Sequence, residues 1–227
     1  INAEERIRVD DIQFGHSKVT GRDSIRIEFP VYESYVTAFY EEDVIEGKWV
    51  VKTRDNYSIP FVAFHGENHR FTELRKKPTL DISGNWEVTF GTDTDDPYKA
   101  IGEFQQDGNR LSGTFRTETG DYRFLEGEVQ ANKVYLSCFD GSHAFLFEAK
   151  ILEDESMIGS FRSGKHYRTT WEAKRNPEFE LGSPDSLTYL KEGYDALSFA
   201  FENPNGKLIS LENEEYQNKV KIVQIFG

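Results

Sequence analysis

The chain has 227 residues, of which 37% are hydrophobic and 30% are charged, and its formal net charge is −13. This composition is typical of a folded globular protein with one large domain or two small ones, and it excludes wholesale disorder. No basic stripe is present to follow a phosphate backbone, and no run approaches the ~20 apolar residues of a membrane-spanning helix. We therefore expect no nucleic-acid partner and no membrane-spanning segment.

Residues 1–176 are predicted to be antiparallel β-structure almost throughout. Apolar and polar residues alternate over Ser24–Phe29, Trp86–Phe90 and Tyr135–Phe139. Gly, Asp and Asn lie between such runs, as in strands that tight turns connect. The polar stretch 73–80 is where two sub-blocks of this region would meet.

A degenerate repeat supports a hairpin architecture: an apolar residue, Gly, one residue, an aromatic residue, then a turn and Tyr. Its copies have Gly47, Gly113 and Gly159 with Tyr57, Tyr122 and Tyr167, and Gly84 with Trp86 begins a fourth. Gly is expected where a side chain would clash or where a closed sheet must bend. The repeat predicts a mainly β protein, an up-and-down meander closed or partly closed into a lipocalin-like or avidin-like barrel.

Two patterns suggest metal ligands but are better explained as loops. His65 and His69 are four residues apart in "HGENH", a spacing that serves a metal only on a helix, and this stretch is rich in turn residues. "DTDDPY" places Asp93 close to two further aspartates. A calcium loop would need Gly at its sixth position, where Tyr98 stands. We therefore predict an exposed loop, a solvated hairpin connection and no metal site.

The "DGSH" stretch, residues 140–143, is predicted first of all as a hairpin turn, since Asp-Gly is a strong turn signal between apolar strands. It also contributes to a candidate ligand-binding or docking site. Ionisable and aromatic side chains that gather at the mouth of a barrel form a plausible binding site. The residues expected to converge there are Tyr122, Arg123, Glu126, Asp140 and His143.

The texture of the sequence changes after residue 176. Residues 177–196 combine Pro, Gly and Ser without a clear period and are predicted to be a linker. Short strands are predicted over Leu197–Phe201 and Leu208–Leu211, with an Asn-Pro-Asn-Gly-Lys turn between them. The final apolar run, Val220–Phe226, suits a strand buried on both faces of a parallel sheet.

This last region resembles the opening of a thioredoxin-like domain of the TlpA/ResA and AhpC/TSA-related kind. "FAFENPNGKLISLENEEYQNKVKIVQIFG" shares a Phe-containing strand, an Asn-Gly-Lys turn, a short second strand, and Asn-Lys-Val before an apolar strand. "TETGDYRFLEGEV", "KVYLSCFDGSHAFLFEAKI" and "SPDSLTYLKEGYD" resemble the N-terminal domain attached to a subset of exported thiol-disulfide oxidoreductases of this kind. The resemblance covers much of residues 80–227.

The resemblance implies an accessory domain (1–176), a linker and the start of a redox domain (197–227). In that family, the strand matching Val220–Ile225 leads into Trp-Cys-x-x-Cys at a helix N-terminus, which stabilises a thiolate. Both cysteines would follow Gly227, so we expect no catalytic residue and no cofactor in this chain. Protein thiols and disulfides would be partners of the redox domain. The resemblance also implies export to the periplasm and allows a lipid anchor upstream of Ile1.

The single cysteine, Cys138, excludes an internal disulfide and a Cys-based metal cluster. Val134, Leu136 and Cys138 share one face of a predicted strand, which predicts a buried and inert thiol. The alternative, a redox partner for the Cys-x-x-Cys pair, would need an exposed thiol beside a positive charge.

Two other functions stay open. The barrel could hold a small hydrophobic ligand, as lipocalins and avidins do, and "NRLSGTF" resembles an avidin strand. Alternatively, the chain is a scaffold that docks the redox domain or its protein substrates. An alternation that places large aromatic side chains on both faces of the barrel would favour a filled interior over a cavity, and so disfavour the ligand-binding module.

Overall fold

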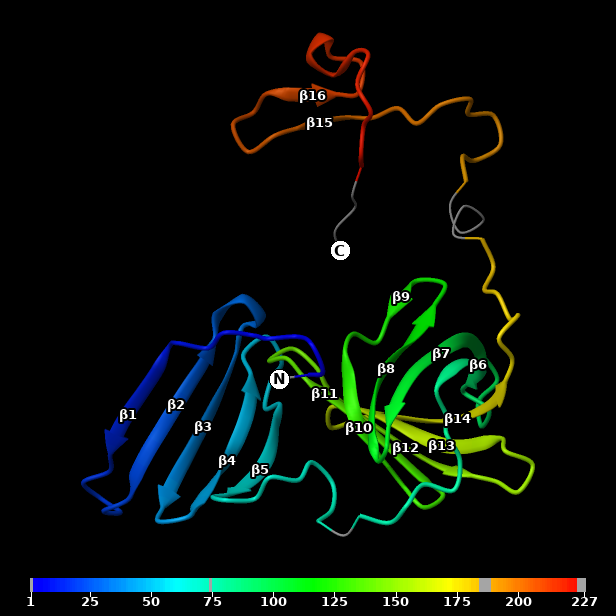
Figure 1. Cartoon of the computed structure of the whole chain (residues 1–227). Helices are drawn as coiled ribbons and strands as arrows, with labels where there is room; N and C mark the ends of the chain where they lie inside the picture. Colours follow the sequence, from blue (N-terminus) through cyan, green and yellow to red (C-terminus); the bar gives the residue numbers. More distant parts are fainter. Residues whose placement is uncertain (1, 74, 184–188, 224–227) are drawn as a thin grey trace. The chain divides into compact units, whose positions relative to one another are not determined.

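The computed structural model describes residues 2–73, 75–183 and 189–223. The chain forms two compact units, residues 1–182 (unit 1) and residues 183–227 (unit 2) (Figure 1). In the described residues, helical structure is limited to two short 3-10 turns, Pro30–Tyr32 and Glu214–Tyr216. None of these residues forms a helix of the length and hydrophobicity needed to span a membrane. The prediction of a mainly β protein is confirmed.

Unit 1 begins with a five-stranded antiparallel meander, the first sheet. Its strands are β1 (Ile12–His16), β2 (Asp23–Phe29), β3 (Ser34–Glu41), β4 (Val44–Val51) and β5 (Ser58–Phe64). Each strand pairs with the next along the chain, so β1 and β5 are the two edges (Figure 1). Side chains alternate between the two faces, so that Ile25 and Ile27 lie on an apolar face while Arg26 and Glu28 lie on a charged one.

The second part of unit 1 is an eight-stranded, closed antiparallel barrel (Figure 1). Its strands are β6 (Gly84–Phe90), β7 (Tyr98–Asp107), β8 (Arg110–Thr117), β10 (Leu125–Gln130), β11 (Lys133–Phe139), β12 (Ala144–Ile151), β13 (Met157–Ser163) and β14 (Tyr167–Arg175). The short β9 (Gly120–Asp121) pairs antiparallel with the end of β8. Two pairings beyond the simple hairpins complete the ring: β14 pairs with β6, and β8 pairs with β10. The predicted closed meander is confirmed.

Aromatic side chains fill the interior of the barrel. The largest fully buried side chains are Trp86, Trp171, Phe90, Phe115, Phe147 and Phe161. The rings of Phe147 and Phe161 stack with centroids 4.2 Å apart and planes 4° from parallel, and Phe115 lies 4.7 Å from Phe147. These rings occupy the space that holds the ligand in a lipocalin-like barrel, and their mutual packing stabilises the closed sheet.

The repeated glycines have a common physical cause. A Cβ atom on Gly47, Gly113 or Gly159 would lie only 2.1–2.2 Å from a carbonyl oxygen of the neighbouring strand. The backbones approach each other too closely at these points for any side chain. The aromatic residue two positions later is buried in each copy of the repeat, as Trp49, Phe115 and Phe161. The repeat therefore marks places where a strand pair closes tightly over an inward aromatic ring.

Unit 2 contains the predicted hairpin, but its first strand begins at Ala200 rather than at Leu197. Strand β15 (Ala200–Glu202) pairs with β16 (Leu208–Ser210), and no strand is found in the described residues between 176 and 200. The turn is held by Asn203, whose backbone N–H donates to Lys207 O at 2.9 Å and whose Oδ1 accepts the Lys207 N–H at 3.0 Å. The Asn-Pro-Asn-Gly-Lys turn predicted from the sequence is thus confirmed.

The final apolar run does not form the predicted strand within its described part. Residues 220–223 have no strand conformation, and residues 224–226 lie outside the described residues. Val220 and Ile222 are 95% and 93% exposed. A strand buried on both faces needs neighbouring strands and covering helices. The described residues of unit 2 supply neither, so the prediction of a buried strand is wrong for residues 220–223.

Candidate functional site

The predicted Asp-Gly turn joins β11 to β12 at one end of the barrel. Asp140 Oδ1 accepts hydrogen bonds from the backbone N–H groups of Ser142 at 2.7 Å and of His143 at 2.6 Å. A short carboxylate can satisfy the N–H groups two and three residues further on, and this is why Asp favours such turns. The Asp140 side chain is fully buried.

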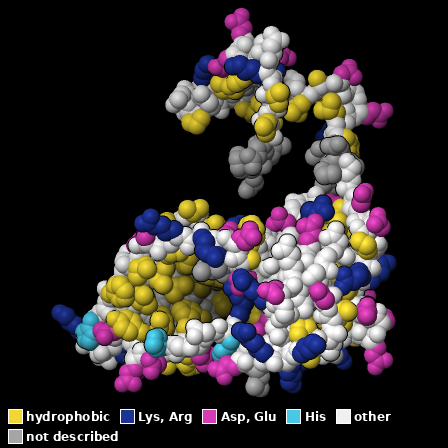
Figure 2. Space-filling model, in the orientation of Figure 1, with side chains coloured by type: hydrophobic (Ala, Val, Ile, Leu, Met, Phe, Trp, Pro, Cys, Tyr) yellow, Lys and Arg dark blue, Asp and Glu magenta, His cyan; other side chains and the backbone are white. Residues whose placement is uncertain are grey.

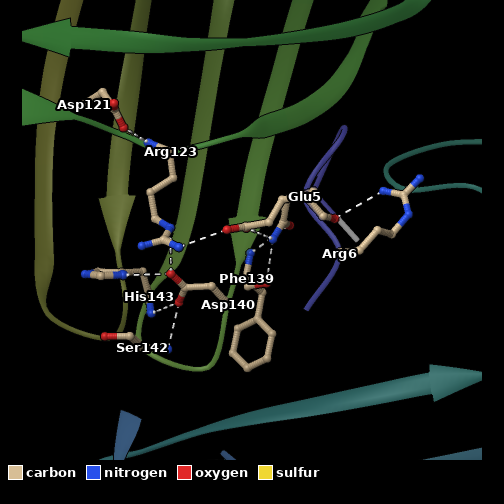
Figure 3. A network of polar contacts seen from close by, with 9 residues as sticks. Glu5, Arg6, Asp121, Arg123, Phe139, Asp140, Ser142 and His143 are labelled. Atoms are coloured by element: carbon tan, nitrogen blue, oxygen red, sulfur yellow. Dashed lines mark hydrogen bonds and ion pairs between the residues drawn. The ribbon is translucent and has the colours of Figure 1, made fainter. Parts of the chain in front are cut away.

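Three of the predicted site residues meet at the second oxygen of Asp140. Asp140 Oδ2 lies 3.1 Å from His143 Nδ1 and 3.1 Å from Arg123 Nε (Figure 3). Arg123 Nη2 in turn donates a hydrogen bond to Glu5 Oε1 at 2.9 Å. We call these four residues, Glu5, Arg123, Asp140 and His143, the Asp140 cluster.

The surroundings of the Asp140 cluster favour the charged forms of Asp140 and Arg123. Burial by itself raises the pKa of the Asp140 carboxyl, because removal from water disfavours the charged form. Hydrogen bonds from the His143 ring and from the backbone N–H groups of His143 and Ser142 outweigh burial and lower that pKa to about 2. Asp140 is therefore a carboxylate at neutral pH, and His143 carries its proton on Nδ1. The hydrogen bond to Glu5 raises the pKa of Arg123, which stays charged.

Glu126 lies beside the Asp140 cluster rather than within it. Its Oε2 accepts the backbone N–H of Ala3 at 2.8 Å. The carboxylate also lies 3.4 Å from Arg110 and 3.7 Å from Arg70. Glu126 therefore holds the same N-terminal segment that contributes Glu5, and it reaches the cluster only through that segment.

Tyr122 is turned away from the Asp140 cluster. Its hydroxyl lies 2.7 Å from the hydroxyl of Tyr98, and its ring packs 5.0 Å from the ring of Phe161. Burial raises the pKa of the Tyr122 phenol. Both residues lie in the loop between β9 and β10, where Arg123 has a left-handed backbone conformation with φ 63°, and Tyr122 faces the barrel core while Arg123 faces the cluster. The separation therefore depends on the conformation of this loop and not on strand alternation.

The N-terminal segment supplies two residues that the sequence reasoning missed, Glu5 and Asn2. The side-chain amide of Asn2 donates to Phe139 O at 2.9 Å and accepts from Phe139 N at 3.2 Å. Asn2 is almost fully buried, and it copies the pair of hydrogen bonds that a neighbouring strand would make with β11. Asn2 lies 137 residues before Phe139 in the sequence, so no local pattern reveals the contact.

The same turn is where the first sheet joins the barrel. Gly141 O accepts a hydrogen bond from the hydroxyl of the fully buried Ser34. A Cβ atom on Gly141 would lie 2.6 Å from the ring of Phe29, so the ring can sit on the turn only because this residue is Gly. The ring of Trp49 packs edge-on against Phe139, with centroids 5.3 Å apart. We call this contact region the joint.

The ionisable side chains at the joint are engaged with one another. Both oxygens of Asp140 are already occupied by His143, Ser142 and Arg123. The nearest thiol, Cys138, is buried, and burial together with the charges of Asp140 and Glu5 raises its pKa to about 11. The prediction of a buried thiol is confirmed. A thiol of this kind is a poor nucleophile at neutral pH.

No protein-family model, curated protein or solved structure matches this chain. The resemblance of the C-terminal region to a thioredoxin-like domain therefore stays a prediction. The same holds for export to the periplasm and for a ligand role of the five predicted site residues.

The histidines and aspartates considered as metal ligands, His65, His69 and Asp93, lie in loops, as predicted. His65 Nδ1 lies 3.3 Å from Asp43, whereas His69 Nε2 lies 3.9 Å from Glu67, so the two imidazoles face different carboxylates. Asp93 accepts a hydrogen bond from Thr170 Oγ1 at 2.7 Å in the exposed connection between β6 and β7. Across the described part of the chain, no group of three or more His, Cys, Asp and Glu side chains is placed to share a metal ion.

Proposed function

We propose that this chain is the accessory N-terminal region of an exported thiol-disulfide oxidoreductase of the thioredoxin-like superfamily, and that it lacks the catalytic cysteines itself. The observation that carries the proposal is the β15–β16 hairpin. The residues that resemble the start of a thioredoxin-like domain lie in a compact unit of their own and form the strand, Asn-Gly-Lys turn and strand that the resemblance implies.

The exposure of the C-terminal apolar side chains supports the same proposal. Val220 and Ile222 are almost completely exposed, although such residues are normally covered. In a thioredoxin-like domain the corresponding strand is central, with helices over both faces. Under this proposal, the remainder of the redox domain would bury these side chains.

In this proposal, unit 1 takes no part in thiol-disulfide exchange. Exchange between a dithiol and a disulfide passes through a mixed disulfide that a second cysteine resolves. Cys138 is the only cysteine, and it is buried in the barrel with a pKa raised to about 11. Unit 1 therefore serves the redox domain by binding or positioning rather than by exchanging electrons.

The test compares residues 1–227 with the protein translated from the natural reading frame through and beyond Gly227. Both are assayed for catalysed reduction of insulin disulfides. We expect activity only in the longer protein, and we expect Cys138→Ala to leave that activity unchanged. A reading frame without a Cys-x-x-Cys shortly after Gly227 would overturn the proposal, and so would turnover by residues 1–227 that Cys138→Ala abolishes.

A scaffold role for unit 1 is the second candidate function, and one observation favours it. The first sheet leaves large apolar side chains such as Phe14 exposed to solvent, which marks an interaction surface. The barrel offers no comparable support for a small-ligand module, because the aromatic rings around Phe147 and Phe161 fill it.

A further inference from the structure

One face of the first sheet is apolar, and part of it is open. The register places Phe14, Ile25, Ala38, Gly47 and Phe61 opposite one another in a row across all five strands. The apolar side chains on this face that are not fully buried include Phe14, Ile25, Ile27, Val36, Ile45 and Phe61. We call them the open apolar face, and Figure 2 shows hydrophobic side chains gathered over this sheet.

The joint covers only one end of this face. Phe29 and Trp49, on the same side of the sheet, pack against Phe139 of the barrel. Away from the joint, Phe14 is 72% exposed. Here Phe14, Ile25 and Ile45 line a hollow of about 360 Å³. An antiparallel sheet normally packs its apolar face against another layer, so this part of the face lacks the layer that the pattern implies.

The edge of the sheet beside this hollow is free to pair. Glu28 N donates to Asp11 O, and Ser17 N donates to Arg22 O. Inward and outward hydrogen bonds alternate along an antiparallel strand, so the backbone N–H and C=O of Phe14 point away from β2. Among the described residues, no strand pairs with this side of β1.

The opposite edge of the sheet is blocked. Val51 N donates to Tyr57 O, and the same alternation then directs the backbone of Pro60 outward from β5. Proline has no N–H, so it interrupts the outer edge of β5 and discourages strand pairing there. An added strand would therefore pair with β1, where its inward side chains would lie over Phe14 and Ile25.

The acidic residues beside the hollow indicate which kind of polypeptide could bind there. Glu42 and Asp43 stand at the rim of the hollow. Asp43 Oδ1 lies 3.3 Å from His65 Nδ1, and Glu42 has no ion-pair partner among the described residues. A second copy of the chain would bring two acidic rims together, and each copy carries a net charge of −13. Like charges disfavour that arrangement, whereas Lys or Arg at the end of a bound segment would complement the rim.

We propose that the open apolar face and the free edge of β1 bind an extended polypeptide segment of another protein, with apolar side chains at alternate positions and Lys or Arg at one end. The backbone of the segment would add a sixth strand beside Phe14, and its alternate side chains would cover the hollow. This inference rests on the scaffold role proposed above and gives that role a partner, but it does not depend on the redox assignment.

The test measures binding of a short fluorescent peptide, alternating Val and Thr and ending in Lys residues, by fluorescence anisotropy with unit 2 in place. Phe14→Glu should weaken binding by about tenfold or more, since it removes an apolar contact and adds a charge on the apolar face. Val62→Glu is the matched control, because Val62 is also exposed but lies on the opposite face of β5. The melting temperature of each variant shows that it remains folded.

Two further measurements separate the elements of the proposal. A peptide N-methylated on alternate residues of its pairing edge should bind about tenfold more weakly, because it cannot hydrogen-bond to β1. Glu42→Lys should weaken binding of the Lys-ended peptide and strengthen that of a Glu-ended one.

Three outcomes would overturn the proposal. They are equal binding by Phe14→Glu and Val62→Glu, a dimer in sedimentation that Phe14→Glu dissolves, and binding to phosphatidylcholine vesicles with none to the peptide. None of these outcomes bears on insulin reduction by the longer protein, so failure here leaves the redox proposal standing.

Discussion

Arg123 Nε lies 3.1 Å from the buried Oδ2 of Asp140, although the two residues flank different strands of the barrel. Arg123 also donates to Glu5, while the Asp140 turn carries Gly141, on which the first sheet rests. One ion pair thus connects the N-terminal segment, the barrel rim and the joint. Because Asp140 is fully buried, the interaction is screened far less than a surface ion pair would be.

Replacing Asp140 should therefore destabilise unit 1. Asp140→Asn keeps one acceptor for the turn but removes the charge that faces Arg123 and His143. We expect the free energy of unfolding to fall by about 1.5–3 kcal/mol, because the buried side chain loses its charge-assisted hydrogen bonds, although Arg123 keeps its ion pair with Glu5. Urea unfolding at neutral pH measures this change. The matched control is Asp154→Asn, since Asp154 accepts the same kind of turn hydrogen bond from Ser156 but is exposed. Equal losses in the two variants would contradict the argument.

The contribution of Asp140 should disappear at acid pH. Its pKa is lowered from an ordinary 3.8 to about 2 in the folded protein. The stabilisation is therefore complete above about pH 4 and is lost as the pH falls towards 2. That lowering corresponds to about 2 kcal/mol. The difference in unfolding free energy between the wild type and Asp140→Asn should narrow by about this amount between pH 5 and pH 2. A constant difference would show that the charge of Asp140 is not involved.

Most of the fold prediction came from local sequence patterns. Alternation located strands such as β6 and β11, and the recurring glycines marked close backbone approach. The repeat does not distinguish an open sheet from a closed one, however, because Gly47 lies in the first sheet while Gly113 lies in the barrel. Closure depends on the pairings of β14 with β6 and of β8 with β10. The first of these pairs residues more than 80 positions apart in the sequence and leaves no local signature.

The Asp140 cluster also combines contacts that the sequence predicts with contacts that it does not. Asp140 and His143 are three residues apart in the sequence, and the Asp-Gly turn signal predicts their contact. Glu5 reaches Arg123 across 118 residues, which no spacing rule captures. The prediction of a buried strand that begins at Val220 failed for a related reason. An apolar run forms a buried strand only when other strands and helices cover it.

Gly159→Ala should destabilise the barrel. The new methyl group would lie 2.2 Å from the carbonyl oxygen of Glu148 and would also meet the buried ring of Trp171. We expect a loss of about 1–3 kcal/mol or more in the free energy of unfolding, because overpacking forces neighbouring strands apart. Ser160→Ala, one position further along β13, adds no atoms and should change stability little. If Gly159→Ala were as stable as the wild type, the strands would not be as close as described.

Cys138 should react slowly with thiol reagents in the folded protein. Burial, together with the charges of Asp140 and Glu5, raises its pKa to about 11. The reactive thiolate is therefore a minor species at pH 8, and the reagent has no direct access to it. We expect native labelling by a chromogenic disulfide to be at least about a hundredfold slower than labelling in urea. Comparable rates in the two conditions would place Cys138 outside the barrel core.

Phe161→Ala tests whether the barrel is a packed core or a ligand-binding chamber. The Phe161 ring stacks on Phe147 and is almost completely buried, so its removal leaves a cavity that the stiff closed sheet cannot fill. We expect the free energy of unfolding to fall by about 3–5 kcal/mol in urea titrations. Phe124→Ala is the matched control: Phe124 is about half exposed, and its loss should cost far less. A chamber designed to open around a ligand would tolerate the loss of one lining ring. A cost for Phe161→Ala no greater than that for Phe124→Ala would therefore restore the ligand-binding barrel as a functional candidate.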